Sequence, residues 1–87
     1  MIKNLINKYI EKLTINDIYE FASKNGITLK EYEANIIYSY TKKYWEVVVF
    51  SDHNPILRKV KDSLEPTTYN KLNELINFYK DKYKNYL

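Results

Sequence analysis

The chain has 87 residues and a net charge of +3, with 14 lysines and arginines against 11 acidic residues. This length has room for one hydrophobic core, so we predict a single helical domain over residues 1–87. The chain contains no cysteine and one histidine, His53, which excludes a disulfide framework and any zinc site that needs thiolates or two imidazoles.

The first half of the chain carries three helical patterns with start and stop signals. Apolar residues over 2–13 recur at the spacing of one helix face. Thr14 and Asp17 then form a hydroxyl-x-x-acid cap, which predicts a second helix over about 15–24 that ends at Gly26. Thr28-x-x-Glu31 is a similar signal and predicts a third helix that runs to about Tyr44.

The segment WEVVVF (45–50) breaks the helical pattern, because β-branched and aromatic residues dominate it. A single strand would have no partner in this chain, so we predict an extended connector at about 45–51. A fourth helix, capped by Ser51 or Asn54, follows and ends near Leu64. Pro66 opens a fifth helix over 67–86.

These patterns predict an all-α fold, a small irregular bundle of about five helices with one extended connector. The longest uninterrupted apolar run, Val47 to Phe50, is too short to span a bilayer or to form a signal segment, so we expect a cytoplasmic protein. The predicted core consists of Leu13, Ile18, Phe21, Ile36, Val49, Leu57, Val60, Leu72 and Ile76.

In three stretches the capping residues and the apolar positions follow one another in the same order as in a known family. The stretches are LTINDIYEFASKNGITL (13–29), VVVFSD (47–52) and LEPTTYNKLNELI (64–76). In them the chain resembles a family of short helical proteins of unknown function from low-GC Gram-positive bacteria. The sequence departs from the family pattern at Ser51 and at Glu65. The resemblance implies an all-helical fold and carries no known activity, so it brings no functional residues.

The apolar stripe of the last predicted helix continues to the final residue, while Lys80, Lys82 and Lys84 lie on its other side. A stripe that the rest of the chain is too short to cover must pair with another chain or bind a partner. Packing against the chain's own core is the first interpretation of this stripe, and an interface is the second. For the function we predict a non-catalytic protein-interaction module, which binds a protein partner or forms a homodimer. The predicted interaction face is Tyr79, Tyr83, Tyr86 and Leu87.

The alternative function is weak, salt-dependent nucleic-acid binding. Basic residues flank the predicted connector on both sides, and two aromatic residues there could stack on bases. The presence of only one arginine weakens this hypothesis. The residues of this predicted basic patch are Lys42, Lys43, Tyr44, Trp45, Arg58, Lys59 and Lys61.

No other motif supports a chemical function. Ala22 and Gly26 have the spacing of a helix-turn-helix, but the helix after them begins with Glu31 and Glu33, which DNA phosphates would repel. His53 has neither a second imidazole nor a convergent set of ligands, so we expect it to have no chemical role. We expect no enzyme activity, no cofactor, no metal and no membrane insertion.

Overall fold

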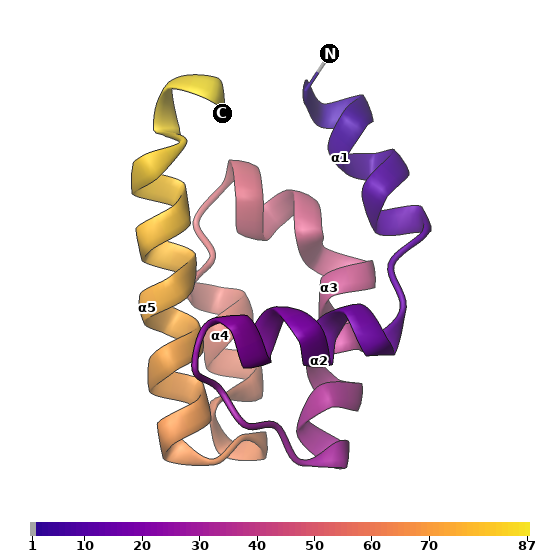
Figure 1. Cartoon of the computed structure of the whole chain (residues 1–87). Coiled ribbons are helices and arrows are strands. Elements are labelled where there is room, and N and C mark those ends of the chain that lie inside the picture. The colour runs from indigo at the N-terminus through magenta and orange to yellow at the C-terminus, as the bar shows by residue number, and fades with distance from the viewer. Residues whose placement is uncertain (1) are drawn as a thin grey trace. The chain divides into compact units, whose positions relative to one another are not determined.

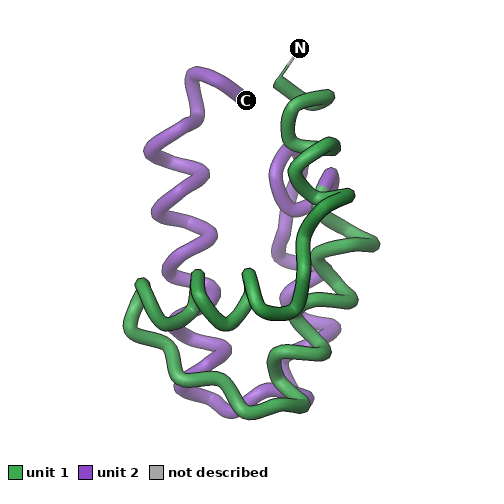
Figure 2. The backbone as a smooth tube through the Cα atoms, turned by 45° about the vertical axis from the view of Figure 1, so that its right-hand side comes forward, with its two compact units in different colours: residues 1–45 green, residues 46–87 purple. Residues whose placement is uncertain are grey.

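The computed structural model describes residues 2–87, and these form five α-helices and two single-turn 3-10 helices (Figure 1). The helices are α1 (Ile2–Glu11), α2 (Ile15–Lys24), α3 (Glu31–Phe50), α4 (Asn54–Val60), η1 (Lys61–Ser63), α5 (Pro66–Lys82) and η2 (Lys84–Tyr86). No strand occurs within residues 2–87, which confirms the predicted all-helical fold. The backbone groups into two compact units, one of residues up to Trp45 and one of Glu46–Leu87 (Figure 2).

In the first unit, α1 and α2 run in different directions and are separated by a short turn (Figure 1). The predicted capping box forms at this turn. Thr14 Oγ1 accepts from the Asp17 N–H at 3.2 Å, and Asp17 Oδ2 accepts from the Thr14 N–H at 2.9 Å. The two side chains satisfy backbone groups that the start of a helix leaves without partners, so the local sequence sets where α2 begins.

The end of α2 is a Schellman motif built on Gly26, as the sequence predicted. Gly26 has φ +72°, its N–H donates to the Ser23 carbonyl at 3.2 Å, and the Ile27 N–H donates to the Ala22 carbonyl at 2.8 Å. Ala22 and Ile27 are both buried, which is the apolar contact that accompanies this motif. The left-handed backbone at Gly26 therefore fixes how the chain leaves α2.

Replacing Gly26 with alanine should lower the free energy of unfolding by about 1–2 kcal/mol, the usual cost of a left-handed backbone for an L-residue. A Cβ atom at this position would meet no heavy atom within 4 Å, so the whole loss would come from the backbone conformation. Urea denaturation followed by circular dichroism measures it. Ser23→Ala, an exposed substitution in the same turn, serves as control, and a loss at Gly26 no larger than the control's would contradict the motif.

The predicted cap at Thr28 and Glu31 is wrong, because α3 begins at Glu31 itself. Lys30 precedes the helix, and its carbonyl accepts the first helical bond, from the Ala34 N–H at 3.0 Å. The buried Glu33 Oε1 accepts from the Lys30 N–H at 3.1 Å. An acid three residues after the cap thus accepts from the cap's N–H, as the pattern predicts. The acid is Glu33 rather than Glu31, two positions later than predicted.

The predicted extended connector at 45–51 is also wrong, because α3 continues without interruption to Phe50, and the Ser51 N–H still donates to the Val47 carbonyl at 2.9 Å. Valine costs a helix at most about 0.7 kcal/mol per residue. Continuing an existing helix gains one backbone hydrogen bond for each residue added, whereas an isolated extended segment leaves its backbone groups without partners. The helix therefore extends through a segment with strand propensity.

In the second unit, neither Ser51 nor Asn54 caps α4. His53 precedes the helix without a side-chain capping bond, and Asp52 Oδ1 instead accepts from the Asn54 N–H at 3.0 Å. The predicted proline positions are confirmed, because Pro55 lies in the first turn of α4 and Pro66 opens α5. The side chain of Asp52 therefore contributes a hydrogen bond to the short segment between α3 and α4.

The core agrees only in part with the predicted list. Leu57 and Val60 are buried, six residues are half-buried, and Phe21 is 47% exposed, so its assignment to the core is wrong. Successive residues of a helix point about 100° apart, so a short helix that buries Ala22 turns its neighbour outwards. The half-buried six are Leu13, Ile18, Ile36, Val49, Leu72 and Ile76.

Candidate functional site

Four aromatic rings follow one another at the C-terminal end of the second unit, and we call them the aromatic ladder: Phe78, Tyr79, Tyr83 and Tyr86. The rings of Tyr79 and Tyr83 are stacked, with centroids 6.3 Å apart and planes 7° from parallel. Phe78 meets Tyr79 edge-on at 5.3 Å, and Tyr86 meets Tyr83 at 6.3 Å. Each ring is thus held by a neighbouring ring in an arrangement that aromatic pairs favour.

The ladder arises because Tyr79 and Tyr83 are four residues apart and lie one turn above another. The predicted helix over 67–86 is wrong at its end, since α5 stops at Lys82 and the chain tightens into η2. The Tyr83 N–H still donates to the Tyr79 carbonyl at 3.0 Å, and the Tyr86 N–H then donates to the Tyr83 carbonyl at 2.9 Å. An exposed last turn has little packing to hold an α-helical geometry, so 3-10 turns are frequent there.

Most of the ladder is accessible to solvent. Phe78 is 58% exposed, Tyr83 44% and Tyr86 67%, and the adjoining Leu87 is 42% exposed. Of the predicted interaction face, the three tyrosines are in ring contact with one another and Tyr79 is half-buried. Large apolar side chains that gather on one accessible surface are typical of binding sites. Phe78 is an addition to the predicted interaction face.

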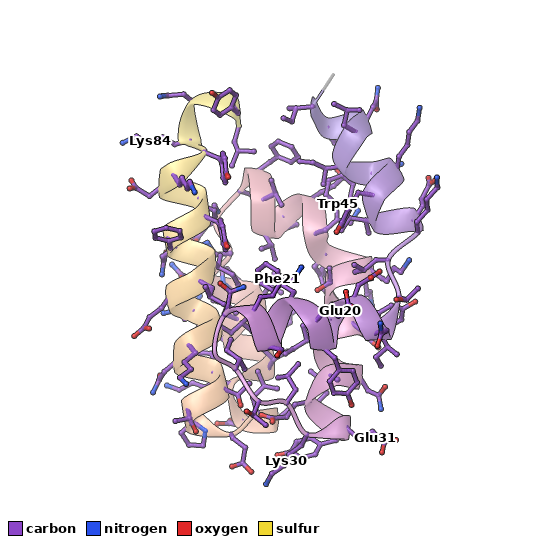
Figure 3. All side chains as sticks on the ribbon, in the orientation of Figure 1. Glu20, Phe21, Lys30, Glu31, Trp45 and Lys84 are labelled. Carbon is purple, nitrogen blue, oxygen red and sulfur yellow. The ribbon has the colours of Figure 1, made fainter. Side chains whose placement is uncertain are left out.

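Lysine side chains border the ladder. The ammonium group of Lys82 lies 5.8 Å from the ring centre of Phe78 and 5.4 Å from that of Tyr83, within the range of cation–π attraction. Lys84 points away from the helix (Figure 3), and its ammonium group lies 3.7 Å from the Asp81 carboxylate. Both side chains of this ion pair are largely exposed, so it contributes little to stability.

A second cluster joins the end of α5 to the turn before α4. The Lys80 ammonium group donates to the Ser51 carbonyl and lies 3.1 Å from His53 Nδ1. Since an ammonium group has only donors, Nδ1 must accept, and the neutral imidazole carries its proton on Nε2. His53 is 93% buried, with only 7% of its surface exposed, and its Nε2 has no hydrogen-bond partner within residues 2–87.

Burial lowers the pKa of His53 below its ordinary value of 6.5, and the positive charge of Lys80 lowers it further. The Asp52 carboxylate and the Asn77 side chain raise the pKa of His53, but they do not outweigh burial and Lys80. Sequence reasoning missed this cluster because it placed Lys80 on the solvent side of the helix. Lys80 follows the half-buried Ile76 by four residues, and this spacing was the available signal.

The residues predicted as one basic patch belong to both units. In the first unit, the Lys42 ammonium group donates to the carbonyls of Ile10 at 2.6 Å and Glu11 at 3.1 Å, which caps the C-terminus of α1. Lys43 lies over the Tyr44 ring at 5.3 Å, and Trp45, labelled in Figure 3, is buried. Lys42 therefore has a structural role, and Trp45 does not present its ring for stacking.

In the second unit, Arg58 and Lys59 are exposed on α4, and the Lys61 ammonium group lies 5.8 Å from the ring centre of Tyr69. The convergence of these residues with those around Lys42 into one surface stays a prediction. No three histidine, aspartate or glutamate side chains within residues 2–87 gather in a group that could hold a metal ion. No helix of the described chain is long and apolar enough to cross a membrane.

Comparison with known families relates most of the chain to a family of unknown function. Residues 1–80 match the model of a family described as "Protein of unknown function (DUF2624)". No curated protein and no solved structure matches the chain. The match includes Phe78, Tyr79 and Lys80 and ends before Tyr83 and Tyr86, so it covers the His53–Lys80 cluster and half of the aromatic ladder.

Proposed function

The chain belongs to this family of proteins of unknown function, and we propose that it is a non-catalytic protein-interaction module whose aromatic ladder binds a protein. The occupant is another protein or a second copy of the chain. The observation that carries the proposal is the exposure of Phe78, Tyr83 and Tyr86 together with Leu87 on one continuous segment.

The physical chemistry of the ladder suits binding better than solvation. A fully buried aromatic side chain removes about 150–250 Å² from water, at about 25 cal/mol per Å². Tyrosine also has few rotatable bonds, so its immobilisation in an interface costs less entropy than that of a longer side chain. The stacked pair of Tyr79 and Tyr83 is already ordered in the free chain, which reduces this cost again.

The placement of the single imidazole supports a non-catalytic role. A general base must reach the proton that it abstracts, within hydrogen-bond distance or through one water molecule. His53 is buried, and its Nδ1 accepts from Lys80, so neither ring nitrogen is presented to a substrate. Nucleic-acid binding receives less support than protein binding, because Lys42 is engaged with α1 and Trp45 is buried.

The test compares the association of the chain with other proteins, or with itself, before and after the aromatic ladder is disrupted by substitution. Proteins captured on the immobilised chain are purified and retested by titration, and the mass of the chain in solution is measured by light scattering. The double substitution Tyr83→Ala with Tyr86→Ala should weaken partner binding, or dissociate a dimer, by at least about tenfold.

A matched control is Tyr9→Ala on α1, which removes an aromatic ring that is 69% exposed but lies outside the ladder. It should leave association unchanged. A chain that stays monomeric, and that binds its partners equally well with and without the two tyrosines, would refute the proposal.

A further inference from the structure

We propose that the partner of the aromatic ladder is an acidic amphipathic segment of another protein. This inference rests on the proposed function and goes further by naming the chemistry of the occupant. It is carried by the distribution of charge around the exposed rings.

Residues 78–87 contain three lysines against one aspartate, so their side chains carry a charge of +2. The three lysines have different surroundings. Lys80 donates to the Ser51 carbonyl and His53, and Lys84 lies 3.7 Å from Asp81. Lys82 lies on the ladder itself, over the faces of Phe78 and Tyr83. A ligand that covers these two rings therefore also meets the ammonium group of Lys82, which lies over them.

A carboxylate beside an apolar stripe complements this surface. The apolar side chains of the partner would remove Phe78 and Tyr83 from water, while its carboxylate pairs with Lys82. The apolar contact would supply most of the affinity, and the charge pair would select the partner and speed the encounter. Without that carboxylate, a partner would dehydrate Lys82 and offer it no counter-charge.

A second copy of the chain fits this surface less well. In a two-fold symmetric dimer the same patch meets itself, so a side-chain charge of +2 on one copy would approach the same charge on the other. Like charges across an interface are unfavourable and reject partners. The whole chain also carries a net charge of +3, which adds to the repulsion between copies.

The experiment uses three fluorescently labelled amphipathic peptides of about 18 residues, each with leucines on one helix face. They carry glutamate, glutamine or lysine at the remaining positions and are otherwise identical. Fluorescence anisotropy with the full chain should show that the glutamate peptide binds at least about tenfold more tightly than the glutamine peptide. The lysine peptide should bind weakest, and the affinity of the glutamate peptide should fall with added salt.

The substitution Lys82→Glu should reverse the order of the glutamate and lysine peptides. Lys8→Glu, at an exposed position of α1, makes the same change of net charge away from the ladder and should preserve the order. Equal effects of the two substitutions would overturn the inference, because the net charge alone would then explain the preference.

The remaining outcomes separate the inference from the proposed function. Equal binding of the glutamate and glutamine peptides, lost in Tyr83→Ala, would overturn the acidic partner and keep the ladder as a docking surface. Failure of all three peptides, with binding only to anionic lipid vesicles, to oligonucleotides or to a second copy, would overturn the acidic partner as well. Tight binding of the glutamate peptide that Tyr83→Ala leaves unchanged would refute the proposed function itself.

Discussion

Replacing Leu57 with alanine should lower the free energy of unfolding by about 2–5 kcal/mol. Leu57 is 4% exposed and lies on α4 with Ile56 and Val60, which are also buried. Removing its side chain loses the transfer free energy of the buried atoms and leaves a cavity, because the surrounding residues relax only in part. Small domains have a total stability of about 5–15 kcal/mol, so this single substitution would remove a large share of it.

Urea denaturation of both proteins, followed by circular dichroism, measures the difference. Arg58→Ala is the matched control, since it truncates the next residue of the same helix on its exposed side. It should change stability by no more than about 0.5 kcal/mol. A loss below about 1 kcal/mol at Leu57 would show that α4 does not bury this residue.

The second large effect is a loss of stability as the pH falls below 6.5. Burial and the charge of Lys80 lower the pKa of His53 in the folded chain, whereas the unfolded chain keeps the ordinary value of 6.5. Well above pH 6.5 the imidazole is neutral in both the folded and the unfolded chain, and the histidine has no effect on the pH dependence. Below it the unfolded chain takes up a proton first, so stability falls by up to about 1.4 kcal/mol per pH unit until the folded form is protonated too.

His53 is the only histidine, so one imidazole resonance in an NMR titration reports its pKa directly. The midpoint should lie below 6.5, and Lys80→Met should raise it, because the repulsion between ammonium and imidazolium disappears while the burial remains. His53→Gln should flatten the pH dependence of stability between about pH 5 and 6.5, a range above the ordinary titration of carboxylates. A wild-type midpoint above 6.5 would contradict the buried, lysine-paired histidine.

The features that the sequence predicted correctly are those in which a few neighbouring residues decide the outcome. The capping box of Thr14 and Asp17 and the left-handed turn at Gly26 each form within six residues of chain. Their hydrogen bonds are nearly independent of the rest of the molecule, so a local pattern suffices to predict them. The stacking of Tyr79 and Tyr83 was not predicted, but it too has a local origin, because a separation of four residues on a helix brings the rings together.

Two of the wrong predictions concern places where the rest of the helix or its surroundings override a local preference. Residues 45–50 have strand propensity but continue α3, since helix growth satisfies their backbone groups and an isolated strand does not. The prediction for Phe21 failed for a similar reason. Ala22 is the one buried residue of α2. The local sequence does not show how much of the surface of this helix its neighbours cover.

The backbone partners of Lys80 and Lys42 could not be identified from local sequence, although the spacing from Ile76 indicates that Lys80 lies near the half-buried side of α5. Each side chain reaches backbone carbonyls about 30 positions earlier in the chain, at Ser51 and at Ile10. A lysine that extends into solvent and a lysine that donates to the carbonyls at a helix end can have the same neighbouring residues in the sequence. This is why sequence reasoning, which assigned Lys80 to the solvent side of its helix and Lys42 to a basic patch, did not find these backbone contacts.

The hydrogen bonds between Lys42 and α1 affect which helix unfolds locally first. None of the residues of α1 is buried, and Ile6 and Ile10 are only half-buried, so this helix has little apolar area to hold it in place. The Lys42 ammonium group on α3 donates to the carbonyls of Ile10 and Glu11, the last two residues of α1. Acetylation of Lys42 would remove that charge and two of its donors, so we expect the amides of α1 to exchange with deuterium faster than those of α3.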